Sequence, residues 1–569
     1  IKMRDGNAKK FAAIGGVGTI SSRLTLEGPI VKDKSSFMIA GRRSYADIFL
    51  PFAPDENIQD SKLFFYDLNL KANYELSDKD RLYVSGYFGR DVLGLSELFG
   101  INWGNATATL RWNHLVNEKM FVNTSLVYSD FNYGVDISFA DNASFGLDQS
   151  INDIYIKSDW TNFVNQKSKL NFGGQVIYHR FNPGLFAPNN EESGLIFEEI
   201  QIEKRKALES GWYVDHEYKH STRLNFRYGL RFSTFSNIGG SEYTYTKNPE
   251  TNEPIAELTV RDSFGASEIY NTYAGLEPRA SISYNLTTTM ALKGSYNRTF
   301  QYVQQATNTA SSFPTDQWFS ANKNIKPQRA DQVAIGLFKN FDLGLETSAE
   351  IYYKWMDNQI DYRDNAALAF NENLDGELLT GDGWAYGAEF YVAKTEGRSS
   401  GFISYTWAKT MRQINGISGD NPYVAGFDRR HNLSVVFTQK FSKRLLATAS
   451  FVFASGQPLT TPVSKYFYDG EWQTNYNSQE RNNFRLPAYH RADIGVTLKG
   501  KEKPNKRLKS NWNFSIYNLY NRENPYALYF REIRDTDLEK FPNAQVGNTG
   551  AFQTTLFKII PAVTWNFEF

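Results

Sequence analysis

Apolar and polar residues alternate along much of the chain, and the segment 64–76 shows this pattern most completely. Its apolar set is Phe64, Tyr66, Leu68, Leu70, Ala72, Tyr74 and Leu76, and its other set is Phe65, Asp67, Asn69, Lys71, Asn73 and Glu75. Successive side chains of a β-strand point to opposite faces, so this segment is predicted to be a strand with one apolar and one polar face. A soluble sandwich would also alternate, but tyrosines at both ends of the apolar face favour a strand that crosses a membrane.

The same alternation recurs at 347–356, 432–438 and 512–516. We expect the apolar sets to face lipid and the polar sets to face the interior of a barrel. The residues expected to face lipid include Phe64, Leu68, Leu70, Ala72, Tyr353 and Trp355. Those expected to face the lumen are Asp67, Asn69, Lys71, Asn73, Glu75, Glu350 and Lys354. Such polar residues line a transport path or, more commonly, bind lumen water or a plug, since about half of the strand residues of a large barrel face inward.

Short and long connections alternate between these segments. Short turns are expected at 77–80, 117–119, 287–289 and 442–444, and long polar connections at 236–269, 304–326, 464–483 and 525–548. Short periplasmic turns and long external loops are typical of outer-membrane barrels. The sequence therefore predicts an all-β transmembrane antiparallel barrel of about twenty-two strands, with both termini at the short-turn end.

Composition supports a barrel and excludes several other classes. Aromatic residues make up 15% of the chain, yet its mean hydropathy is −0.50 and it has no apolar run long enough for a membrane helix. The absence of cysteine excludes disulfides, cysteine-bound zinc and thiol catalysis. Equal numbers of basic and acidic residues, 62 each, give no overall basic field for nucleic acid. The six histidines show no metal-ligand spacing and no nucleophile motif is present, so we expect no enzyme activity, metal or cofactor.

Two groups of aromatic residues in the long connections are candidate ligand-binding residues. Trp318 and Phe319 lie in the connection 304–326, and Tyr466, Tyr468 and Trp472 lie in the connection 464–483. Rings on external loops can stack on a sugar, a peptide or a metal chelate. The alternative, more probable for any single ring, is that it packs one loop on another or belongs to the outer aromatic girdle.

The last strand ends on an aromatic residue. Val563, Trp565, Phe567 and Phe569 fall on one face, and Phe569 is the final residue. A terminal aromatic that closes an alternating strand resembles the signal by which outer-membrane barrels are recognised for assembly. We therefore expect Trp565, Phe567 and Phe569 to form that signal.

Several short motifs resemble the barrel of TonB-dependent receptors. They are SSRLTLEGPI at 21–30, GRRSY at 41–45, GWAYGAE at 383–389, DRRHNL at 428–433, SGQP at 455–458, YHRAD at 489–493 and YNLYN at 517–521. The set is most similar to the branch whose members carry a carboxypeptidase-regulatory-like domain before the plug. The resemblance implies a 22-stranded barrel in the outer membrane of a Gram-negative bacterium, an N-terminal plug and a segment that binds TonB.

This resemblance implies residues 1–10 as the end of a plug and the lead into the barrel, and residues 11–569 as the barrel itself. We expect the plug upstream of Ile1, and residues 1–6 at or just inside the periplasmic rim. The expected function is TonB-dependent transport of a scarce ligand: a metal chelate, an oligosaccharide or a peptide. The alternatives are a scaffold for other outer-membrane proteins or lipoproteins, and an open diffusion pore. Expected partners are outer-membrane lipids, the plug, TonB, and surface lipoproteins or other outer-membrane proteins.

Overall fold

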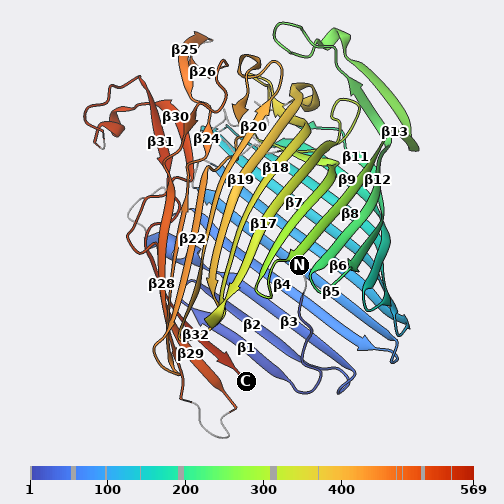
Figure 1. The fold of residues 1–569 in the computed structure, drawn as a ribbon. Helices are drawn as coiled ribbons and strands as arrows, with labels where there is room; N and C mark the ends of the chain where they lie inside the picture. Colours follow the sequence, from blue (N-terminus) through green and yellow to red (C-terminus); the bar gives the residue numbers. More distant parts are fainter. Residues whose placement is uncertain are drawn as a thin grey trace.

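The computed structural model describes residues 3–569 except 53–58, 60, 96–98, 141–142, 190–197, 308–316, 369–370, 469–470, 477, 502–506 and 540. Its main feature is one antiparallel sheet that closes on itself (Figure 1). The sheet has 24 strands, of which β10 (Ile200–Gln201) and β21 (Tyr423–Val424) are two-residue extensions of β11 and β22, leaving a barrel of 22 strands. The last strand pairs with the first, with Trp565 opposite Val17. The predicted fold is confirmed.

The strands of the first half of the barrel are β1 Ala12–Gly18, β2 Ser21–Pro29, β3 Ser35–Ser44, β4 Lys62–Glu75, β5 Asp80–Leu95, β6 Phe99–Asn117, β7 Met120–Ala140, β8 Ala143–Asn165, β9 Ser168–Pro188, β11 Arg205–Lys219 and β12 Leu224–Thr244. Those of the second half are β13 Val260–Asn285, β14 Met290–Gln301, β17 Gln328–Phe341, β18 Leu345–Tyr362, β19 Leu378–Lys394, β20 Ser399–Gln413, β22 His431–Lys440, β23 Leu445–Ala454, β28 Tyr489–Lys499, β29 Lys509–Tyr517 and β32 Ile560–Glu568.

The long connections hold further small sheets and single helical turns. The small sheets pair β15 (Val303–Ala306) with β16 (Gln317–Ser320), β24 (Pro458–Leu459) with β27 (Phe484–Arg485), β25 (Pro462–Tyr468) with β26 (Glu471–Tyr476), and β30 (Ala527–Glu532) with β31 (Thr549–Thr554). The described 3-10 turns are η1 Ala46–Phe52, η3 Ala256–Leu258, η4 Asp342–Gly344, η5 Leu374–Glu377, η6 Ser418–Asp420 and η7 Asp535–Glu539.

Among the described residues, no helix has both the length and the apolar character needed to cross a membrane.

The two ends of the barrel differ in the length of their connections. Turns such as 76–79, 118–119, 286–289 and 441–444 lie at one end, together with the C-terminus, which Figure 1 marks at the lower end. The connections 302–327, 363–377, 455–488 and 518–559 lie at the other end, which we call the mouth. Strands such as β12 and β13, with 21 and 26 residues, are much longer than the 9–11 residues that cross a bilayer and so extend beyond it.

Strand pairing keeps the two faces of the sheet distinct from one strand to the next, as β3, β4 and β5 show. Lys71 of β4 is opposite Met38 of β3 and Ser85 of β5, and residues directly opposite each other share a face. We call the face that carries Lys71 the lumenal face. The other face of β4 carries Leu68 and Leu70, which are 40% and 42% exposed. An exposed apolar outer surface is what a lipid-facing barrel requires.

Candidate functional site: the mouth and the lumenal wall

The connections at the mouth fold inward and pack against the upper part of the wall. Val135 and Ile137 of β7 are buried with Ile360 and Tyr362 of β18 in one hydrophobic cluster. We call this cluster the cap core; its buried members are Val135, Ile137, Phe145, Leu147, Phe186, Ile202, Ala306, Phe319, Ile325, Ile360, Tyr362, Leu374 and Leu378. Because the cap core joins strands β7 to β9 with β18 and with two long connections, these loops form an ordered cap over part of the lumen.

The β15–β16 hairpin belongs to this cap and has two different faces. Gln305 is directly opposite Trp318, and Gln304 is directly opposite Phe319. Gln304 and Phe319 are buried, at 0% and 4% exposure, whereas Gln305 is exposed and Trp318 is half-buried. Because side chains alternate along the two short strands, Gln304 and Phe319 point toward the cap core, and Gln305 and Trp318 lie at its surface.

The burial of Phe319 corrects one expectation from the sequence. The sequence pattern groups Phe319 with Trp318 as a candidate ligand-binding ring, but its side chain lies in the cap core and contacts Tyr362, with ring centroids 6.4 Å apart. A buried ring offers no free face for stacking. Phe319 therefore fixes the hairpin in the cap, as the loop-packing alternative proposed.

Trp318 lines a small cavity whose other walls are three aromatic rings and one amide. The cavity has a volume of about 180 Å³ and is lined by Trp103 of β6, Phe131 and Tyr133 of β7, and Gln305 and Trp318 of the hairpin. Trp103 is 39% exposed, so the cavity is open to solvent. We call it the aromatic recess. Sequence reasoning identified Trp318 but missed the three wall residues, although each is a large aromatic residue on the lumenal face of its strand.

A buried polar network fastens the cap to β18 and β20. Asp361 of β18 accepts a hydrogen bond from the hydroxyl of Tyr423 (2.9 Å) and ion-pairs with Arg412 of β20 (3.5 Å). Arg481, from the connection 455–488, donates to the carbonyl of Tyr362. Burial raises the pKa of Tyr423 well above its ordinary value, so its hydroxyl remains a donor.

The DRRHNL motif starts strand β22 at the mouth. Asp428 is 2% exposed, ion-pairs with Arg485 and accepts a hydrogen bond from the backbone N–H of Thr410 (2.6 Å). Arg430 lies 3.9 Å from the same carboxylate. The carboxylate of Asp428 therefore has its partners within the protein, and it stabilises the start of the strand.

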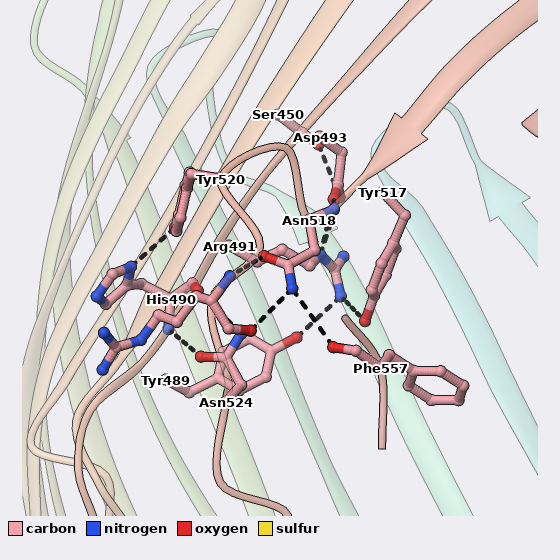
Figure 2. A network of polar contacts seen from close by, with 11 residues as sticks. Ser450, Tyr489, His490, Arg491, Asp493, Tyr517, Asn518, Tyr520, Asn524 and Phe557 are labelled. Atoms are coloured by element: carbon pink, nitrogen blue, oxygen red, sulfur yellow. Dashed lines mark hydrogen bonds and ion pairs between the residues drawn. The ribbon is translucent and has the colours of Figure 1, made fainter. Parts of the chain in front are cut away.

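The YHRAD and YNLYN motifs meet in the network of Figure 2, where β28 and β29 reach the mouth. Arg491 donates to Asp493 (3.0 Å) and to the hydroxyls of Tyr489 (2.9 Å) and Tyr517 (2.7 Å). Asp493 in turn accepts the backbone N–H of Asn518 (2.9 Å). Asn518 has φ of 55° and is fully buried, and its side chain bonds to Arg522. The motifs that carry the family resemblance thus hold strand ends and turns together.

The second aromatic group lies on the β25–β26 hairpin, away from the aromatic recess. Tyr466 is 54% exposed. The strands include Tyr468 and Trp472, with Phe467 opposite Trp472, but the side chains of Tyr468 and Trp472 lie outside the described part of the structure. Lys465 ties this hairpin to the connection 518–559 by a hydrogen bond to the carbonyl of Gly547 (2.7 Å).

The polar residues expected to face the lumen on β4 share one face with Lys71 and bond to neighbours on β3, β5 and the N-terminal segment. Asp67 ion-pairs with Arg42 (2.6 Å), and Glu75 ion-pairs with Arg81 (3.2 Å). The remaining contacts are Asn69 Nδ2 to Asp67 (3.2 Å) and Asn73 Nδ2 to Ser36 (2.7 Å). These contacts occupy much of their hydrogen-bonding capacity.

Glu350 and Lys354 share one face of β18, opposite the face of Tyr353 and Trp355. Glu350 lies beside Gly336 and Glu389, and Lys354 lies beside Gln332 and Ala385. A Cβ on Gly336 would meet the Glu350 side chain at 2.6 Å, so the carboxylate stem folds over the glycine.

A larger recess of about 740 Å³ lies in the lumenal wall between β8 and β14. Ion pairs line it, including Lys169 with Glu217 (3.0 Å) and Arg227 with Asp215 (3.0 Å). The wall below the cap is therefore hydrophilic and mixed in charge. In the part of the chain that the structure describes, no three His, Asp or Glu side chains are grouped so that they could hold a metal ion.

The N-terminal segment runs along the lumenal face from the short-turn end. The carbonyl of Ala8 accepts a hydrogen bond from the backbone N–H of Asp33 in a short turn (2.9 Å). Further in, Lys71 ion-pairs with Asp5 (2.6 Å) and donates to the carbonyl of Met3 (2.7 Å). Met3 to Gly6 therefore lies just inside this rim, as predicted; Ile1 and Lys2 lie outside the described residues.

The C-terminal strand places its aromatic residues beside the first strand. The rings of Trp565 and Phe567 lie 5.1 Å apart, and Trp565 is directly opposite Trp512 of β29. Phe569 exchanges two backbone hydrogen bonds with Ala13, at 2.8 and 3.1 Å, and its side chain is 53% exposed. The terminal residue thus completes the seam of the barrel and leaves its ring accessible.

A closed 22-stranded barrel with short turns at one end, a loop cap at the other and a hydrophilic lumenal wall has the architecture of the outer-membrane transporters. Residues 34–521 match the family described as TonB dependent receptor-like, beta-barrel. The chain therefore belongs to this family of TonB-dependent receptors. It is a barrel of the Gram-negative outer membrane, and its family consists of transport receptors that interact with TonB and not of enzymes.

Solved structures with a similar fold are outer-membrane receptors and transporters. The ferric-catecholate import receptor Fiu from E. coli, in its closed form, has a TM-score of 0.65 at 12% identity, and the match covers 100% of this chain and 82% of Fiu. BauA, the ferric preacinetobactin receptor from Acinetobacter baumannii, gives 0.65 at 11% identity, with 100% and 81% covered. The copper transporter OprC gives 0.65 at 10% identity, with 100% and 84% covered. A search of curated proteins finds no match.

Proposed function

We propose that this receptor captures a scarce extracellular ligand at its mouth and passes it through the lumen when TonB moves a plug. The observation that carries this proposal is the ordered cap, which presents the aromatic recess to solvent above a hydrophilic wall. Rings at the opening provide a place for capture, and polar side chains below can exchange hydrogen bonds with water and a passing solute.

We further propose that residues 1–10 are the end of the plug and the lead into the barrel. A barrel of this strand number encloses a lumen too wide for its own inward side chains to fill, and 22-stranded outer-membrane transporters hold a plug there. The direction of Met3 to Gly6, inward along the lumenal face, supports this assignment. The contacts of Lys71 with Asp5 and Met3 would hold that end of the plug against β4.

The similar structures do not identify the class of ligand, so the evidence for it must come from this chain. The named neighbours take up ferric siderophores and copper, but at 10–12% identity their likeness supports the fold alone. A metal chelate, an oligosaccharide and a peptide can each present a flat ring or a polar rim to the mouth. Tyr466, Tyr468 and Trp472 remain proposed as a second, outer contact for a large ligand.

The proposal is tested with two deletion strains of the source bacterium, one that lacks the receptor gene and one that lacks TonB. Both are grown with single limiting nutrients: ferric chelates, copper, oligosaccharides and peptides. The proposal requires at least one nutrient on which both strains fail and the complemented receptor strain recovers. If the receptor strain grows normally on all of them but loses other proteins or lipoproteins from its outer membrane, the scaffold function replaces uptake.

A further inference from the structure

The aromatic recess has a location suited to capture, because it lies above the lipid. Trp103 marks its level on β6, and the residues that face outward there are polar: Arg90 of β5 donates a hydrogen bond to Asn102 of β6 (3.0 Å). Charged and amide groups on the outer face exclude this level from the apolar band. The recess is therefore in the extracellular extension of the barrel, where an external solute arrives first.

Each wall ring has a polar residue directly opposite it on a neighbouring strand. Trp103 is opposite Asp91 and hydrogen-bonds to its carboxylate. Phe131 is opposite Asn105, and Tyr133 is opposite Gln149. The rings therefore stand beside a row of one carboxylate and two amides.

Two of these polar residues have buried groups that no protein atom satisfies. Gln149 is 5% exposed and neither atom of its amide has a partner; the Oδ1 atom of Asn105 is also buried and unpaired. Buried polar groups normally find a hydrogen-bond partner, because leaving one unmade costs about 1–3 kcal/mol. Asn105 and Gln149 stand beside the wall rings but not in the lining of the cavity, so water that carries its own donors and acceptors is the partner that suits their buried amide atoms.

The charge of the recess separates the possible ligands. Asp91 is the charged member of the row. Arg42 is the cation whose charge attracts this carboxylate, but it is already ion-paired with Asp67 (2.6 Å). Among the described residues, the carboxylate beside the rings therefore disfavours an anionic ferric chelate at the recess. A neutral ligand with an apolar flat face and a rim of hydroxyls meets stacking surfaces and hydrogen-bonding partners together.

We infer that the aromatic recess binds one pyranose ring of a neutral oligosaccharide, stacked between Trp318 of the hairpin and the rings of Trp103, Phe131 and Tyr133. A cavity of about 180 Å³ holds a single six-membered ring and not a whole chelate. The sugar hydroxyls would bond to the polar groups that line the cavity, the amide of Gln305 and the hydroxyl of Tyr133, and through water to the carboxylate of Asp91 beside Trp103. This inference rests on the proposed uptake function and names the ligand class of the same site.

The test measures binding of neutral oligosaccharides to the purified full-length receptor in detergent. A panel of malto-, cello-, manno- and galacto-oligosaccharides is titrated by calorimetry, with a ferric catecholate and a peptide mixture in parallel. We expect at least one neutral oligosaccharide to bind, and Trp318→Ala and Trp103→Ala each to weaken it about tenfold or more. Trp318→Phe should retain most of the affinity, and Phe441→Ala, which removes an exposed ring in a short turn at the other end of the barrel, should leave it unchanged.

Three results would overturn the inference. One is that no neutral oligosaccharide of the panel binds; the second is that binding survives both tryptophan replacements. The third is that the ferric catecholate or a peptide binds in a Trp318-dependent manner. The third result would show that the recess binds a chelate or a peptide and not a sugar, and it would leave the proposed uptake function intact. TonB-dependent growth measured with the same variants separates a failure of this inference from a failure of the uptake proposal.

Discussion

Trp318 and Phe319 are neighbours in sequence, yet their rings lie on opposite faces of the β15–β16 hairpin. Phe319 is buried at 4% exposure in the cap core, and Trp318 lines the aromatic recess. One ring therefore holds the hairpin in place, and the other is positioned by it. Their roles are separable by experiment.

Phe319→Ala should destabilise the cap by about 3–5 kcal/mol, because it leaves a cavity in a packed core. Trp318→Ala should cost much less, since its ring is only half-buried. Limited proteolysis of the mouth at increasing denaturant concentration measures the difference in cap stability between the two variants. Equal sensitivity of the two variants would mean that the hairpin faces are not distinct.

Leu70→Arg should destabilise the barrel by about 2–4 kcal/mol, because it places a charge on the lipid-exposed face near the middle of β4. Asn69→Arg, one residue away on the lumenal face, is the matched control and should cost little. Urea unfolding in lipid vesicles measures both. A shift of the register by one residue would reverse the order of the two variants.

Lys71→Met should release the N-terminal segment. It removes the ion pair with Asp5 and the hydrogen bond to Met3, and because the Asp5 side chain is 48% exposed we expect a loss of about 0.5–1 kcal/mol. Trypsin, which cleaves after Arg4, Lys9 and Lys10, should then cut this segment a few times faster. The exchange Lys71→Asp with Asp5→Lys should slow the cut again; no difference between single and double variants would exclude the ion pair as an anchor.

Asn518→Gly should destabilise the mouth end of β29 by about 1–3 kcal/mol, because it removes the side-chain bonds to Arg522. Asn518→Ala should cost about 1 kcal/mol more, since alanine also resists the φ of 55° that glycine tolerates. Thermal unfolding of both variants in detergent checks the order. Alanine less damaging than glycine would show that the backbone conformation is not a constraint.

The fold was predictable because successive side chains of a barrel strand face lipid and lumen in turn, and this alternation is visible in the sequence. The alternation from Phe64 to Leu76 and the alternation of connection lengths both repeat around the barrel, so an error in one strand does not change the class. Strand lengths were less predictable: β12 and β13 continue past the membrane into the connection expected from 236 to 269. Polar residues in extended extracellular hairpins have the composition of a loop, and only pairing makes them strands.

The candidate site was predictable only in part, because it depends on contacts between distant segments. Trp318 was identified from its aromatic character in a long connection, but Phe319 has the same character and the opposite role. Trp103, Phe131 and Tyr133 were missed although their spacing places them on the inner face of β6 and β7. An aromatic residue at an inward position is a usable signal, yet the hairpin that completes the recess comes from residues about 180 positions later in the sequence.

The most direct test of gated uptake is the time course of ligand entry into living cells. Cells that carry the receptor are given the radiolabelled nutrient identified by the growth panel, with and without TonB and with and without a protonophore. We predict accumulation that requires the receptor, TonB and the proton gradient together, and that falls in Trp103→Ala and Trp318→Ala cells. Entry that continues at the same rate without TonB or the gradient would contradict gated transport and show an open pore.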